Sequence, residues 1–267
     1  EPMWNRNFID NVQITVAEDI GVEHRGRFYE KTGVIRDIVQ NHLLQMLSLI
    51  AMEPPASFKA KEVRDEKVKV IRALRNVAYD EVADYSVAGQ YSSGVVQEET
   101  VPGYREEEDV DPQSMVPTYF AAKLYVENWR WAGVPFYVRT GKRLPRRITE
   151  AVIQFKQPPL KLFRDDCKPL EPSYLSLTIQ PEEKISLHLG VKYPESANLL
   201  VPVDLSFRYR DHFQRSTISP YERLLRDCLL GDQSLFVRQD DVEAAWEFTD
   251  PFSARWDECG CAELYPA

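Results

Sequence analysis

The chain has 267 residues, of which 43% are hydrophobic and 28% charged, a composition typical of a folded globular protein. Its 42 Asp and Glu residues outnumber 33 Lys and Arg residues, and the net charge of −9 disfavours nucleic acid or an acidic membrane surface as a partner. No apolar run approaches the roughly 20 residues of a membrane span, and no secretory signal opens the chain. We therefore predict a soluble, cytoplasmic protein that binds neither nucleic acid nor membrane. Because the sequence opens with Glu1 and an aromatic stretch follows at once, we expect a piece of a longer polypeptide.

The first half of the chain has the patterns of two strands and three helices. Residues 11–18 alternate apolar and polar side chains, as a strand with one buried face does. Apolar residues then recur at helical spacing over 34–52, and Pro54-Pro55 ends that helix. Further along, the pattern predicts an amphipathic helix over 59–76, a strand over 85–91, a solvated acidic loop over 93–116, and a third helix after Pro117-Thr118 that places Phe120, Leu124, Tyr125 and Trp129 on one side.

The second half is richer in strands. Alternating segments bounded by Pro, Gly or charged clusters predict strands over 135–140, 149–156, 173–180, 184–192 and 202–209. Helices are predicted near 219–230 and 238–248. Strands grouped together, with helices grouped elsewhere, favour an α+β fold: a large, mostly antiparallel β-sheet with helices packed on one face.

Several common site motifs are absent from the sequence. No two of the 11 glycines are separated by a single residue, so there is no GxGxxG dinucleotide fingerprint. The two glycine pairs with P-loop spacing lack the following Lys-Ser/Thr, and no HExxH or CxxC occurs. The four cysteines are too sparse for a disulfide framework or a tetrahedral zinc site, and we predict reduced thiols at Cys167, Cys228, Cys259 and Cys261.

His42 is the first candidate for chemistry. It lies in the middle of the apolar helix predicted over 34–52, and its ordinary pKa near 6.5 suits a general base at neutral pH. The alternative is a core histidine that is satisfied by a hydrogen bond. Asp37, five residues earlier, would lie about 140° around an α-helix from His42, which makes it a poor orienting partner. It could still face the same ligand, as could Glu18 at the end of the first strand.

The second candidate is the basic segment 139–147, which has five Lys or Arg residues in nine positions. Gly141, at the end of a strand, would let the backbone approach a ligand, and Lys142 could bind a phosphate as a point charge. The alternative is a charged hairpin that protects an edge strand of the sheet. If the strand continues past Lys142, the side chain of Arg143 points the other way, and its replacement should change little.

Four longer motifs resemble glucose-6-phosphate dehydrogenase. They are Ile35-Arg36-Asp37 through Gln40-Asn41-His42-Leu43-Leu44-Gln45-Met46, Met52-Glu53-Pro54-Pro55-Ala56-Ser57, Val63-Arg64-Asp65-Glu66-Lys67-Val68-Lys69-Val70 and Gly133-Val134-Pro135-Phe136. The resemblance runs across essentially the whole chain and implies a single C-terminal domain, residues 1–267. The family's N-terminal Rossmann domain, with its glycine fingerprint, has no counterpart here. Neither does the family's Asp-His-Tyr-Leu-Gly-Lys segment.

The resemblance implies a role for each candidate. His42 matches the general base that removes the C1 hydroxyl proton while hydride leaves C1 for NADP. Glu18 and Asp37 match carboxylates that bind sugar hydroxyls, and Lys142 matches a substrate-binding lysine. Arg147 and Gln180 match further substrate contacts. Ile148, Val152 and Thr178 stand where the animal enzyme has basic residues for a second, structural NADP, so we expect no such site.

The resemblance thus implies the substrate-side part of an oxidoreductase that converts D-glucose 6-phosphate to 6-phosphoglucono-lactone. This is the first step of the oxidative pentose phosphate pathway, with NADP bound mainly by the missing domain. It also implies a homo-oligomer, expected to be a dimer through the sheet. The competing hypothesis is that the chain alone is a non-catalytic oligomerisation or phosphosugar-binding module, and an upstream Rossmann half would discriminate between the two.

Overall fold

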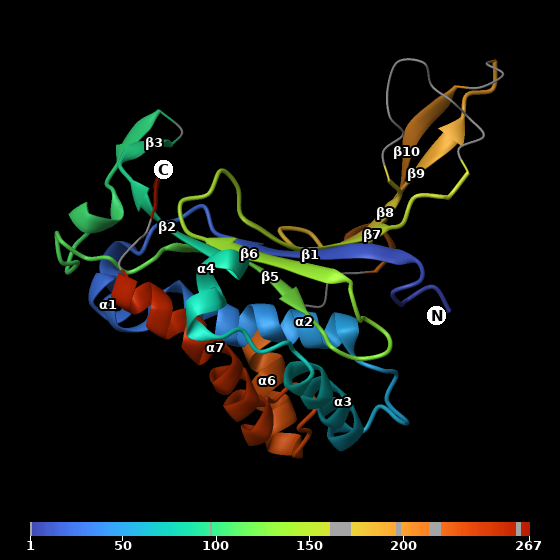
Figure 1. Ribbon diagram of the computed structural model, residues 1–267, viewed down its shortest axis with the longest axis horizontal. Coiled ribbons are helices and arrows are strands. Elements are labelled where there is room, and N and C mark those ends of the chain that lie inside the picture. Colours follow the sequence, from blue (N-terminus) through green and yellow to red (C-terminus); the bar gives the residue numbers. More distant parts are fainter. Residues whose placement is uncertain (1, 97, 161–171, 196–198, 214–219, 260–262) are drawn as a thin grey trace.

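The computed structural model describes residues 2–96, 98–160, 172–195, 199–213, 220–259 and 263–267 (Figure 1). Its centre is one sheet of nine strands: β1 (Ile9–Ala17), β2 (Ser86–Ser92), β5 (Tyr119–Tyr125), β6 (Pro135–Gly141), β7 (Ile148–Phe155), β8 (Tyr174–Gln180), β9 (Lys184–Lys192), β10 (Leu200–Arg208) and β11 (Glu263–Pro266). Their spatial order is β10-β9-β8-β7-β1-β6-β5-β2-β11. Only the β1–β6 and β2–β11 pairs are parallel among the described strands, which confirms a mostly antiparallel sheet.

The long helices lie together on one face of this sheet, as predicted (Figure 1). The helices are α1 (Gly26–Val34), η2 (Ile35–Leu43), α2 (Leu44–Ala51), α3 (Ala60–Arg72), α4 (Val82–Tyr85), α5 (Tyr209–His212), α6 (Pro220–Leu230) and α7 (Gln239–Cys259). Short 3-10 turns are η1 (Glu23–Arg25), η3 (Tyr79–Glu81) and η4 (Tyr104–Glu106), and β3 (Gly94–Val96) pairs with β4 (Glu99–Val101) in a separate small hairpin. No helix of the described ranges is both long and apolar enough to cross a bilayer.

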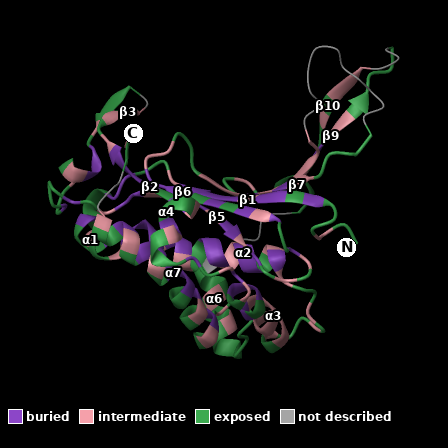
Figure 2. Ribbon diagram, viewed as in Figure 1, coloured by how far each residue is buried: buried purple, intermediate pink, exposed green. Residues whose placement is uncertain are grey.

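The core lies between the sheet and the first layer of helices (Figure 2). Alternate residues of the central strands face the helices, so that Ile14 of β1 and Phe136 of β6 are fully buried. Leu43, Leu44 and Leu47 meet them from the helix side and are also fully buried. Each of these side chains contributes about 1.5–3 kcal/mol through burial.

The segment predicted as one helix over 34–52 begins and ends close to the predicted bounds. Gly33, the penultimate residue of α1, has φ 61° and ψ 174° and so kinks the chain there, and Ala51 is the last residue of α2. Between them, η2 is a π-helix: the N–H of Leu44, the residue after it, donates to the carbonyl of Val39, five residues back. The sequence pattern does not distinguish this wider helix from an α-helix.

The predicted helix after Pro117-Thr118 is wrong, because residues 119–125 form β5, which lies between β6 and β2 in the sheet. Phe120, Ala122 and Leu124 are all buried and Lys123 lies between them, which is the period-two pattern of a strand. The helix predicted over 238–248 runs on to Cys259 and includes Pro251. Strand β11 was not predicted.

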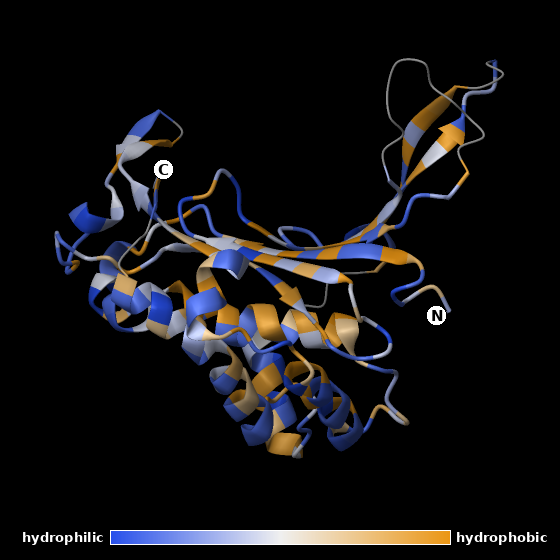
Figure 3. Cartoon of the chain, in the orientation of Figure 1, coloured by the Kyte–Doolittle hydropathy of each residue, from blue (hydrophilic) through white to orange (hydrophobic). Residues whose placement is uncertain are grey.

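Strands β9 and β10 extend away from the helices (Figure 1). Their residues on the face that continues the core are apolar (Figure 3), since Leu187 of β9 pairs with Leu175 of β8 and Leu205 of β10. Leu205 is 59% exposed and Ile179 of β8 is 50% exposed. The end of the sheet therefore presents an uncovered apolar surface, the β8–β10 surface.

Candidate functional site

The loop that joins β6 to β7 crosses the end of β1, because β1 lies between these two strands. Three backbone hydrogen bonds fix the crossing. The N–H of Glu18 donates to the carbonyl of Gly141 over 3.0 Å, and the N–H of Leu144 donates to the carbonyl of Glu18 over 2.9 Å. The N–H of Arg143 donates to the carbonyl of Ile20 over 3.0 Å. The topology thereby brings Glu18 and the basic segment together.

Lys142 is the centre of this crossing and is buried. Its Nζ donates to Oε2 of Glu18 over 2.5 Å, and the same Nζ lies 5.3 Å from the centre of the Tyr29 ring. Tyr29 belongs to α1 and is 2% exposed. An ammonium held between a carboxylate and an aromatic face in a partly dry environment attracts an anion more strongly than it would in bulk water.

Asp37 of η2 lies near the same cluster. Burial raises the pKa of the Tyr29 hydroxyl well above its ordinary value, and the carboxylates of Asp37 and Glu18 raise it further. The neutral tyrosine lies within electrostatic reach of both carboxylates, and the Lys142 ammonium lies over its ring. Direct contact is found between Lys142 and Glu18, and Asp37 approaches the pair from the helix side.

His42 lies on the same helix as Asp37, and its side chain is exposed. The alternative of a buried core histidine is therefore wrong. Because η2 is π-helical, residues five apart lie one turn apart on the same side, so Asp37 and His42 are not separated by the 140° of an α-helix. An exposed imidazole one turn from a carboxylate of the cluster can exchange a proton with a bound molecule.

Arg147 and Gln180 lie at the same end of the strands as Glu18 and Lys142. Arg147 directly precedes β7, and Gln180 is the last residue of β8, opposite Thr149. Both side chains are exposed. These strands are neighbours in the order β8-β7-β1-β6. Their ends therefore place four candidates in a row at one end of the strands: Gln180, Arg147, Glu18 and Lys142.

The structure changes the interpretation of the basic segment at two points, edge protection and the role of Gly141. β6 lies between β1 and β5, so it is not an edge strand, and the hypothesis that its charges protect an edge is wrong. At Gly141, a Cβ would lie 2.8 Å from Cδ2 of Tyr119, so the tyrosine ring occupies the space that the missing side chain leaves.

The side chain of Arg143 is largely buried. Its Nη2 lies 3.6 Å from Oε1 of Glu107, and the two side chains are only 12% and 7% exposed. The hydroxyl of Tyr91 donates to the same Glu107 oxygen over 2.9 Å. A Cβ on Gly21 would lie 2.4 Å from Oε1 of Glu107 and 2.8 Å from Nε of Arg143, so a larger residue there would displace this pair. Glu107 is thus a buried part of the acidic segment predicted to be a solvated loop.

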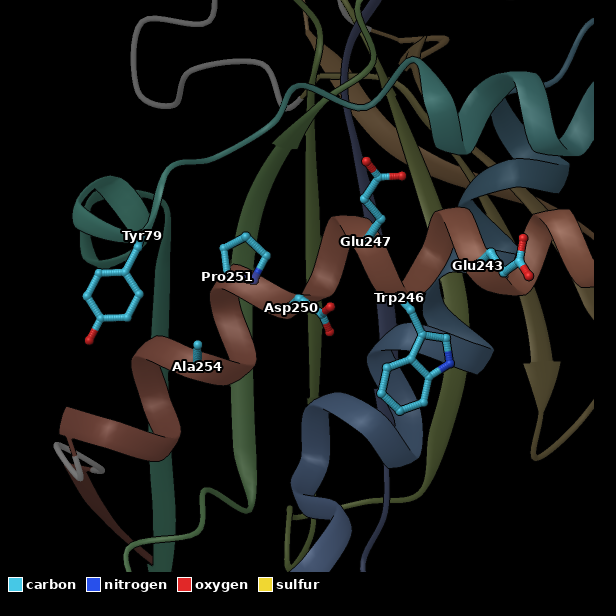
Figure 4. A pocket seen from close by; sticks show the side chains of 7 residues that line it. All are labelled: Tyr79, Glu243, Trp246, Glu247, Asp250, Pro251 and Ala254. Carbon is cyan, nitrogen blue, oxygen red and sulfur yellow. The ribbon is translucent and has the colours of Figure 1, made fainter.

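A separate groove runs along α7 on the helical side of the molecule (Figure 4). It is lined by Tyr79, Glu243, Trp246, Glu247, Asp250, Pro251 and Ala254. None of the six candidate residues lines it. Within the described part of the chain, no group of three or more His, Cys, Asp or Glu side chains is arranged to hold a metal ion.

The family model for the glucose-6-phosphate dehydrogenase C-terminal domain matches residues 1–267. The chain belongs to this family. Similar curated proteins include the glucose-6-phosphate 1-dehydrogenases of Chlamydia muridarum, 46% identical over 97% of this chain and 51% of that protein, and of Bacillus subtilis, 45% identical over 96% of this chain and 52% of that protein. The chain thus spans about half the length of the curated relatives it matches.

Solved structures of the family have the same fold. A glucose-6-phosphate dehydrogenase in complex with glucose 6-phosphate is 36% identical, with a TM-score of 0.88 over 99% of this chain and 53% of that chain. The enzyme from Mycobacterium avium is 34% identical, with a TM-score of 0.82 over 100% of this chain and 53% of that chain.

Several residues that contact the basic segment were not predicted from the sequence. Tyr29 lies under Lys142, and Glu107 holds Arg143. Tyr265, 123 residues from Lys142, donates to the lysine carbonyl. No local pattern identifies such residues, because their role depends on contacts between segments that are distant in sequence.

Proposed function

We propose that this chain is the substrate-side part of an NADP-dependent glucose-6-phosphate dehydrogenase, which oxidises D-glucose 6-phosphate to 6-phosphoglucono-lactone. The observation that carries the proposal is the buried contact of Lys142 with Glu18 over the Tyr29 ring, at the end of β1. A relative of the same fold is described as a complex with glucose 6-phosphate. The whole enzyme would carry out the first step of the oxidative pentose phosphate pathway, in the cytoplasm.

His42 acts as the general base in this proposal. It takes the proton of the C1 hydroxyl as the C1 hydrogen leaves with its electron pair, so that the hemiacetal becomes a lactone. Because His42 is exposed on η2, its imidazole is accessible to a sugar that binds at the ends of these strands.

The other candidates hold the substrate. Lys142 binds the phosphate or a neighbouring oxygen, and Arg147 and Gln180 add contacts from the adjoining strands. Glu18 and Asp37 accept hydrogen bonds from sugar hydroxyls, which orients C1 toward His42. In the absence of substrate, the ion pair between Glu18 and Lys142 holds both side chains in place. When the sugar binds, Glu18 exchanges part of its contact with the ammonium for a sugar hydroxyl.

NADP supplies the hydride acceptor when it is bound. The 11 glycines of this chain form no dinucleotide fingerprint. We therefore assign the coenzyme to the rest of a protein about twice this length, as its relatives are. Residues 1–267 would form its single C-terminal domain.

We also propose that the protein is a homodimer that associates through the sheet. The β8–β10 surface is apolar on the face that continues the core, and Leu205 and Ile179 are about half exposed there. A second copy related by a twofold axis would cover this surface with the same surface of its own.

The test uses the longer protein that contains this chain. The wild type should reduce NADP in the presence of glucose 6-phosphate, and His42→Asn should lower kcat by roughly 10²–10⁴-fold with a smaller change in KM. The exposed Arg146→Ala serves as a control and should keep kcat. A wild type that binds the sugar phosphate without reducing NADP would instead support a non-catalytic binding module, and near-wild-type kcat in His42→Asn would exclude its role as the base.

A further inference from the structure

Both backbone polar groups of Lys142 are held by residues outside its own loop. Its N–H donates to the carbonyl of Thr118 over 3.0 Å, and its carbonyl accepts from the hydroxyl of Tyr265 over 2.7 Å. Thr118 is fully buried at the start of β5, and Tyr265 belongs to β11, the last strand of the sheet. The lysine proposed to bind the phosphate is thus fixed through its main chain as well as its side chain.

The Tyr265 hydroxyl is one link in a directed series of hydrogen bonds. The N–H of Tyr91 donates to Oγ1 of Thr118 over 3.0 Å, and Oγ1 lies 3.0 Å from the hydroxyl of Tyr265. Because the Tyr265 proton is given to the Lys142 carbonyl, its oxygen accepts from Thr118. Each donor in the series from β2 to Lys142 makes a hydrogen bond. In a buried environment, the hydrogen bonds of such a series polarise and strengthen one another.

The ring of Tyr265 is itself held in place. Its centre lies 5.7 Å from that of Tyr119 and 6.5 Å from that of Tyr91, both edge-on, and Tyr265 pairs with Tyr91 across the parallel β2–β11 ladder. Burial raises the pKa of the hydroxyl above its ordinary value, so it remains a proton donor. The strand that carries it therefore presents a rigid donor to the Lys142 carbonyl.

From this geometry we infer that Tyr265 is a positioning residue for substrate binding: its hydroxyl fixes the main chain at Lys142 and thereby aims the ammonium at the sugar phosphate. The inference rests on the proposed function, because it assigns a partner to the lysine of that site. A sub-ångström shift of the Lys142 main chain would be carried to the end of its side chain, where the contact with Glu18 is 2.5 Å.

The experiment compares Tyr265→Phe with wild type in the longer protein. Phe keeps the ring contacts and removes only the hydroxyl. KM for glucose 6-phosphate should rise roughly threefold to tenfold, the worth of one neutral hydrogen bond, while kcat and KM for NADP stay within about twofold. The matched control is Tyr79→Phe, which removes a tyrosine hydrogen bond of the same length, 2.7 Å to Glu258, from the groove along α7. That variant should leave all three constants unchanged.

A double-mutant cycle separates positioning from a merely structural role. Lys142→Ala alone should raise KM for glucose 6-phosphate by about 10- to 150-fold, the worth of a charged hydrogen bond. Alanine keeps the carbonyl of residue 142, so adding Tyr265→Phe should still lower the thermal stability but no longer change KM. If Tyr265→Phe does not fold in the wild-type background, Thr118→Val interrupts the same series one link earlier and should raise the same KM.

Two outcomes would overturn the inference while leaving the proposed function intact. One is a Tyr265→Phe enzyme of lowered thermal stability and unchanged KM. The other is an equal rise in KM whether or not Lys142 is present. A wild-type protein that does not reduce NADP with glucose 6-phosphate would overturn the proposed function and the inference together.

Discussion

Replacement of Arg143 by alanine should destabilise the domain strongly, because its side chain is buried against that of Glu107. The change leaves the Glu107 carboxylate, 7% exposed, without its cation. Breaking a buried ion pair in this way costs about 3–5 kcal/mol of unfolding free energy. The Arg143–Glu107 separation of 3.6 Å and the remaining hydrogen bond from Tyr91 favour the lower end of that range.

At roughly 2–4 °C per kcal/mol for a domain of this size, a loss of about 3 kcal/mol lowers Tm by about 6–12 °C. Thermal and urea unfolding of this chain measure the effect directly. Arg146→Ala, in the same basic segment but exposed, is the control and should change the unfolding free energy by less than about 0.5 kcal/mol. Adding Glu107→Gln to Arg143→Ala should restore much of the stability, because the amide carries no charge and its oxygen still accepts from Tyr91. Equal stability of Arg143→Ala and wild type would refute the buried-pair reasoning.

Three further predictions concern the chain as a whole. The isolated chain should form no NADPH from glucose 6-phosphate, and activity above background in a coupled absorbance assay would contradict the assignment of the coenzyme to another domain. It should nevertheless be a dimer at tens of micromolar, so that a light-scattering mass near 31.0 kDa would be evidence against association through the β8–β10 surface. Finally, hydrogen bonds from Lys61 and Arg238 lower the pKa of Asp65 from 3.8 to about 2. Its stabilisation is present above the unfolded value and lost as pH falls through this window, so Asp65→Asn should show a shallower loss of stability there than wild type.

The strands were predicted well where one face is buried and the other is not. β1, β6 and β9 alternate clearly, and their bounds agree with prediction to within two residues. The prediction for β5 failed because Ala121-Ala122-Lys123-Leu124 consists of good helix formers. The position of this segment between β2 and β6 overrides that propensity. β11 is short and half polar, and it pairs in parallel with a strand far away in sequence, so nothing local marks it.

The resemblance named the candidate residues one by one but could not give their arrangement in space. The resemblance named His42, Asp37 and Lys142, yet the angle between the first two depended on a helix type that periodicity could not resolve. The side-chain direction of Arg143 was inferred from strand alternation extended past Gly141, where the strand ends. Arg143 has φ 52°, so the alternation of a strand does not apply at that position.

The position of β1 at the centre of the sheet has a consequence for biosynthesis. Its neighbours β6 and β7 come much later in the chain: Thr15 and Arg139, which pair across β1 and β6, are 124 residues apart. At ribosomal rates of about 5–20 residues per second, β1 waits roughly 6–25 s for its first partner strand. During that time a segment with Ile9, Val12, Ile14 and Val16 is exposed and able to pair with other nascent chains. The domain should therefore depend on a chaperone that shields this strand until residue 155 has emerged, and its yield on refolding should fall steeply with protein concentration.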